Sequence, residues 1–204
     1  MMTRTTSLVL GVALLLGLAP GALAAQPTPV DPGILTPRPN PNFDWDCTST
    51  GQRILCDGVE VISAVDAGDD PAFSCDGRLI LNTFTQVVTS NRTHDAEGRV
   101  IRNHLVGTFD EQWRLEGTTG PVLTARGRWA VSSNYAQPGV IESRITTFSG
   151  GQLAVSAPGV GLIFQNTGRV RLNWDDSEVL AMSGPQAFED FDAAIGAACD
   201  AFGA

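Results

Sequence analysis

The sequence predicts an all-β fold in which an antiparallel meander of about eight strands closes into an up-and-down barrel with one C-terminal helix. Three observations support this prediction. Apolar and polar residues alternate with a period of two over much of the chain after residue 43, which is typical of strands with one buried face. Short segments rich in Gly, Asp, Ser and Pro separate these runs and favour antiparallel hairpins. One apolar repeat at three- and four-residue steps near the C-terminus indicates a helix.

Residues 1-24 have the features of a secretory signal peptide. Arg4 supplies a positive charge, residues 8–18 form an apolar run of eleven residues, and Ala22 and Ala24 fit a small-x-small cleavage pattern. The run is too short for a stable membrane span. We therefore expect cleavage near Ala24/Ala25 and a secreted, extracellular protein without a membrane span.

Residues 25-42 contain six prolines among eighteen residues. Because proline lacks a backbone N–H and fixes φ, this composition predicts an extended, disordered linker. A single domain then occupies residues 43-204, a length that suffices for one hydrophobic core and is too short for two.

The clearest strand pattern covers residues 123–131, where apolar residues and glycine take the odd positions and Arg126 and Arg128 take even ones. Further strands are expected over 59–65, 78–89, 99–115 with a bend near Gly107, 140–148, 152–156, 159–166, 169–174 and 178–182. Residues 149–151 and 167–168 read as turns because they are rich in glycine.

Residues 186-202 predict the C-terminal helix. Apolar residues recur there at helical spacing, and acidic residues stand in the first turns, where the helix dipole favours them. We expect this helix to cover the barrel mouth or to lie on its wall. The fold predicted for the whole domain is therefore a calycin- or lipocalin-like barrel.

The four cysteines are even in number and lie after the predicted signal peptide, which indicates disulfides in an oxidising compartment: Cys47, Cys56, Cys75 and Cys199. Three pairings are possible. We favour Cys47–Cys56, which closes a short loop, and Cys75–Cys199, which ties the first long strand to the C-terminal helix. No CxxC spacing points to zinc, so no metal site is expected.

The chain resembles uncharacterised secreted proteins of actinobacteria over about residues 73-202. The likeness rests on the segments 73–79 (FSCDGRL), 98–103 (GRVIRN) leading to Gly107, 157–162 (APGVGL) and 168–170 (GRV), and on a cysteine in the final helix. It implies secretion and a small β-barrel-like domain, and it supplies no activity or catalytic residues. Cys47 and Cys56 depart from the two-cysteine pattern of these proteins.

Composition and motifs exclude several kinds of chemistry. All thirteen basic residues are arginine, so Schiff-base and phosphate-loop lysine chemistry is excluded. A net charge of -9 disfavours nucleic acid. His94 falls in a predicted turn, where we expect a solvated imidazole, and the carboxylate pairs Asp69-Asp70 and Asp175-Asp176 also sit in turn-rich segments. We therefore predict no catalytic residue, no metal ligand and no cofactor.

The candidate site consists of polar and tryptophan side chains whose parity places them on the apolar face of their strands. Convergent polar groups among aromatic rings are what a ligand pocket in a barrel would offer. The candidate ligand-binding residues are Asn82, Gln86, Asn103, Glu111, Trp113 and Trp129. Two alternatives stay open: a bulge near Gly107 would reverse the parity of Glu111, and inward amides could simply bond each other in a filled core.

The leading functional prediction is a secreted, non-enzymatic β-barrel module that binds a small apolar or amphipathic molecule. One alternative is a cell-envelope or protein-interaction module with a filled core, for which the proline-rich segment is the motivating feature. Another is a cyclase or isomerase that acts in the barrel lumen without a recognisable motif. The sequence does not indicate an oligomeric state.

Overall fold

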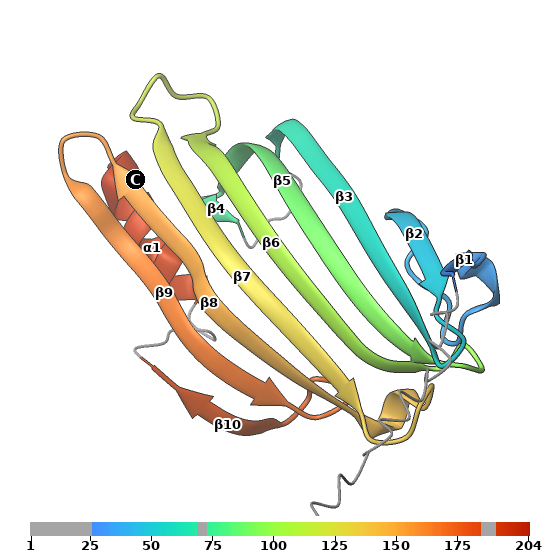
Figure 1. Cartoon of the computed structure of the whole chain (residues 1–204). Coiled ribbons are helices and arrows are strands. Elements are labelled where there is room, and N and C mark those ends of the chain that lie inside the picture. The colour runs from blue at the N-terminus through green and yellow to red at the C-terminus, as the bar shows by residue number, and fades with distance from the viewer. Residues whose placement is uncertain (1–25, 69–72, 185–190) are drawn as a thin grey trace, which may run out of the picture.

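The structure is a computed structural model that describes residues 26–68, 73–184 and 191–204, which form one sheet of ten strands and one α-helix (Figure 1). The strands are β1 Thr28–Pro29, β2 Asp44–Ser49, β3 Arg53–Ala67, β4 Ser74–Cys75, β5 Arg78–Asp95, β6 Val100–Leu115, β7 Leu123–Tyr135, β8 Arg144–Ala157, β9 Gly161–Leu172 and β10 Val179–Ser183. The helix α1 spans Phe191–Phe202, and two short 3-10 helices, η1 and η2, span Pro32–Ile34 and Ile141–Ser143.

The strands follow one another across the sheet in nearly their chain order, β1-β2-β3-β5-β6-β7-β8-β9-β10, with β4 paired to β5. All of these pairings are antiparallel, so the predicted antiparallel meander with a C-terminal helix is confirmed. The predicted closure into a barrel of about eight strands is not what the structure shows. Among the described residues β1 and β10 lie at opposite edges and are not paired with each other. β1 has two residues and β10 has five, and in the described ranges residues 60–67 of β3 and 161–168 of β9 pair with a neighbouring strand on one side only, so the sheet ends at open edges.

The glycine-rich segments 149–151 and 167–168 are not turns, which corrects the expected division of this region into four strands. They lie inside β8 and β9, where Gly150 pairs with Gly168. A Cβ atom on Gly150 would lie 2.4 Å from the carbonyl oxygen of Arg128. Glycine therefore allows a close approach of backbones at this position, next to register shifts in the ladders of β8 with β7 and β9.

The helix α1 covers one end of a sheet face that we call the pocket face, which is the face carrying Ile80, Trp113 and Leu123. Ala194 and Ala198 of α1 are fully buried, and the helix contacts β4, β8 and β9. The disulfide Cys75–Cys199 joins this helix to β4, and a second disulfide joins Cys47 to Cys56, so both favoured pairings are confirmed. No α-helix in the described ranges is long and apolar enough to cross a membrane.

The proline-rich segment differs from the predicted disordered linker, because most of it packs against the other end of the sheet. The N–H of Thr36 donates to the carbonyl of Gly98 (2.9 Å), and the N–H of Val100 donates to the carbonyl of Thr36 (2.8 Å). Leu35 is 3% exposed in a small core beside the Cys47–Cys56 disulfide. The prolines alternate with residues that still have an N–H to donate, so the segment can pair in spite of its composition. The predicted signal peptide lies outside the described residues.

His94 is buried, which corrects the expectation of a solvated imidazole in a turn. β5 continues past the predicted end at residue 89 as far as Asp95, and His94 has no exposed surface. Burial, followed by the positive charge of Arg92, lowers the pKa of His94 to about 4 against the opposing effects of the Ile54 backbone and Asp95.

The two disulfides should stabilise the fold to different extents. Replacing both Cys75 and Cys199 by serine removes a cross-link between residues that are 124 positions apart in the sequence. Replacing both Cys47 and Cys56 removes a cross-link between residues that are 9 positions apart. The loop-entropy relation gives losses of about 5 and about 3 kcal/mol in the free energy of unfolding. Urea denaturation of the two double variants tests this order. Equal losses in both variants would contradict it.

His94 should make stability depend on pH. Between pH 6.5 and about 4 the unfolded chain protonates this imidazole and the folded chain does not, so stability falls as the pH falls through this window. The loss should reach up to about 3 kcal/mol. We expect His94→Gln to remove this part of the slope when urea midpoints are compared with the wild type across the window. Parallel pH profiles for the two proteins would exclude the effect.

Candidate binding pocket

The middle of the pocket face contains a cavity of about 740 Å³. It lies between the end covered by α1 and the end covered by the N-terminal segment, and strands β5 to β9 contribute most of its walls. Six aromatic side chains line it: Phe73, Phe84, Phe109, Trp113, Trp129 and Phe148. The polar lining side chains are Asn82, Glu111, Gln152 and Asn166.

The strand register explains how residues far apart in sequence meet in this cavity. Asn82 lies opposite Trp113, and Glu111 lies between Phe84 on β5 and Ala125 on β7. Directly opposite residues point to the same face of a sheet, so these side chains share the pocket face.

Two reciprocal pairs of glycine and an aromatic residue form the centre of the pocket. Gly107 on β6 is opposite Trp129 on β7, and Phe109 on β6 is opposite Gly127 on β7. A Cβ atom on Gly107 would lie 2.2 Å from ring atoms of Trp129, and one on Gly127 would lie 2.4 Å from the ring of Phe109. Each ring therefore lies against the backbone of the neighbouring strand, in space that only glycine leaves free.

β6 passes Gly107 without a bulge, because its register with both neighbours continues through this residue. Glu111 therefore keeps the parity that the alternation predicts and lies on the pocket face. The indole Nε1 of Trp113 donates a hydrogen bond to Glu111 Oε2 (2.8 Å), and Trp113 is 2% exposed. Burial raises the pKa of Glu111 above its ordinary value, while the hydrogen bond from Trp113 opposes this effect.

The structure brings together four of the six predicted site residues, since Asn82, Glu111, Trp113 and Trp129 all line the cavity. Gln86 and Asn103 share the pocket face but do not line it. Gln86 lies opposite Phe109, and Asn103 accepts a hydrogen bond from Ser90 Oγ (2.9 Å). Asn103 therefore belongs to a polar region near the N-terminal segment.

Sequence reasoning missed the side chains that β8 and β9 contribute to the cavity, among them Phe148, Gln152 and Asn166. The predicted turns at 149–151 and 167–168 interrupted the alternation in both strands. Continuing the alternation through the glycines places Phe148 and Gln152 on one face of β8, and the register shift after Gly151 brings Leu153, opposite Asn166 of β9, to the pocket face as well. Phe73, just before β4, was also missed, and its ring packs edge-on against Trp113 with centroids 4.9 Å apart.

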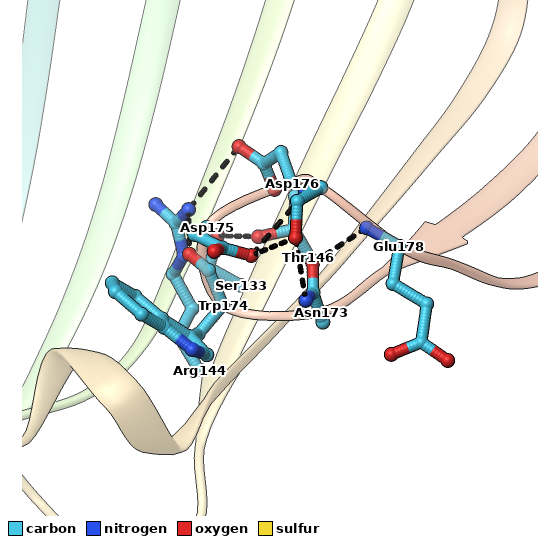
Figure 2. Close-up of polar contacts among 9 residues, drawn as sticks. Ser133, Arg144, Thr146, Asn173, Trp174, Asp175, Asp176 and Glu178 are labelled. Carbon is cyan, nitrogen blue, oxygen red and sulfur yellow. Dashed lines mark hydrogen bonds and ion pairs between the residues drawn. The ribbon is translucent and has the colours of Figure 1, made fainter.

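The carboxylates Asp175 and Asp176 belong to a turn and not to a catalytic pair (Figure 2). Arg144 at the start of β8 donates to the carbonyl of Trp174 and to Asp176 (3.2 Å). Asp175 accepts hydrogen bonds from the hydroxyl (2.7 Å) and backbone N–H (3.2 Å) of Ser177, and the hydroxyl contact is the main cause of its lowered pKa. Both carboxylates are thus occupied in fixing the connection between β9 and β10.

Asp69 and Asp70 lie outside the described residues. In the ranges that the structure describes, no three His, Cys, Asp or Glu side chains are grouped so that they could hold a metal ion. No protein-family model, curated protein or solved structure matches this chain.

The packing of Trp129 against Gly107 can be tested by substitution. In Gly107→Ala the added methyl group overlaps the indole ring, so we expect a loss of about 1–3 kcal/mol in stability and a shift in tryptophan emission. Gly151→Ala is the matched control, because a Cβ atom there meets nothing within 4 Å. Similar losses in both variants, measured by urea denaturation and fluorescence, would argue against this packing.

Proposed function

We propose that the protein is a secreted, non-enzymatic module that holds a small apolar or amphipathic molecule in this cavity. The observation that carries the proposal is a cavity of about 740 Å³ lined by six aromatic side chains and few polar ones. Pockets for small molecules commonly measure about 300–1,000 Å³ and combine mostly apolar walls with a few polar groups that orient the ligand.

The polar side chains of the cavity support an amphipathic ligand over a purely apolar one. The Nε2 atom of Gln152 is buried and has no hydrogen-bond partner. Leaving such a group unpaired costs free energy, which a hydrogen-bond acceptor on a ligand would recover. The amide of Asn82 and the carboxyl group of Glu111 line the same cavity and add polar contacts.

The two disulfides favour an oxidising, extracellular type of environment. With the predicted signal peptide, they support secretion after cleavage near Ala24/Ala25 as part of the proposal. A carrier or receptor for a small molecule outside the cell requires no catalytic residues, and this agrees with the use of Asp175 and Asp176 in a turn. The cavity also favours this function over an interaction module with a filled core.

Filling the cavity should reduce binding. Val131 lines it, so Val131→Phe adds volume inside, whereas Val87 is 38% exposed on the opposite face of the sheet and Val87→Phe is the matched control. We expect at least about fivefold weaker binding of the neutral fluorescent probe N-phenyl-1-naphthylamine to Val131→Phe and little change in the control. Native mass spectrometry of the wild type should show a retained ligand or added probe.

Circular dichroism melting of both variants establishes that each one is folded. A folded Val131→Phe protein that binds the probe as tightly as the wild type would remove the cavity as the binding site. A wild-type protein that retains no ligand and binds no apolar probe would contradict the function itself.

A further inference from the structure

Glu111 is the one charged side chain among the described residues that line the cavity. Its Oε2 atom accepts the hydrogen bond from Trp113, and Glu111 has no ion-pair partner in the described part of the chain. The arginines nearest to it along β6 and β7 pair elsewhere: Arg114 with Asp66, and Arg126 with Asp110. A carboxylate held among aromatic rings without a counter-charge is costly, and a cation in the cavity would lower that cost.

The aromatic side chains beside Glu111 suit the same kind of ligand. Phe84 lies directly opposite Glu111 on β5, and Phe109 precedes it by two residues on the same face of β6. Trp129, which lies against Gly107, is on the same face of the sheet. The faces of aromatic rings carry negative potential, so an ammonium group within about 6 Å of a ring centre is attracted to them.

From these observations we infer that the ligand is an organic cation, with an apolar body among the aromatic rings and an ammonium group beside Glu111. This inference rests on the proposed function, and it narrows the ligand from apolar or amphipathic molecules in general to positively charged ones. An anionic amphipath such as a fatty acid is disfavoured, because no positively charged side chain stands among the described lining residues and Glu111 would lie near its carboxylate.

Titration of the full chain with three probes of equal chain length tests the inference: decyltrimethylammonium, 1-decanol and decanoate. Tryptophan fluorescence and calorimetry report binding. The wild type should bind the cation on the order of tenfold more tightly than the alcohol and should bind decanoate most weakly. In Glu111→Gln the side chain keeps its size and its acceptor for Trp113, so the cation should lose its advantage while the alcohol still binds.

Asp110→Asn is the matched control, since the chain carries a net charge of -9 and attracts cations in general. Asp110 neighbours Glu111 in sequence but is exposed on the opposite face, where it pairs with Arg126. This variant loses the same charge and should keep the preference for the cation.

The outcomes separate the inference from the proposed function. If the alcohol binds as tightly as the cation, or if Glu111→Gln keeps the preference, the inference is overturned and the pocket remains a site for neutral molecules. If Asp110→Asn loses the preference as well, the attraction is general and the inference is also overturned. If none of the three probes binds the wild type, the proposed function fails together with the inference.

Discussion

A sheet that does not close must have one of its faces covered by other parts of the chain, and the rest of this structure depends on that constraint. The helix α1, joined to β4 by Cys75–Cys199, covers one end of the pocket face. The N-terminal segment covers the other end through Leu35 and the paired backbone of Thr36. Between these two covers the aromatic side chains meet a cavity instead of a second layer. The pocket thus lies where neither α1 nor the N-terminal segment packs against the pocket face.

Glycine opposite an aromatic residue recurs in this sheet. Trp45 lies against Gly58, as Trp129 lies against Gly107 and Phe109 against Gly127. In each pair the ring occupies the space that a side chain on the opposite strand would need. The sheet therefore gains buried aromatic area without a second layer of structure over these positions, and the two pairs on β6 and β7 give the pocket its floor.

Alternation alone placed the central strands and four of the pocket residues, because the buried face of β5, β6 and β7 follows a period of two without interruption around Asn82, Glu111 and Trp129. It failed where glycine has two uses. Gly150 and Gly168 read as turn residues, but they allow close backbone contact inside long strands. Burial of His94 and the packing of residues 28–37 depend on contacts between distant segments, which local composition does not record.

The two edges of the sheet differ in what they offer to another chain. At the β1 edge, Pro29 has no N–H to donate, and the part of β2 beyond β1 carries the charges of Asp44 and Asp46. β10 is exposed along its whole length and presents apolar side chains, among them Val179 and Met182. On the β1 side of the sheet β3 continues beyond β2, since among the described residues its positions 60–67 pair with β5 alone, and Val61 and Val65 are exposed there. Proline and acidic residues therefore guard only the β1–β2 part of that side, and both sides of the sheet keep backbone groups that a strand from another chain could pair with.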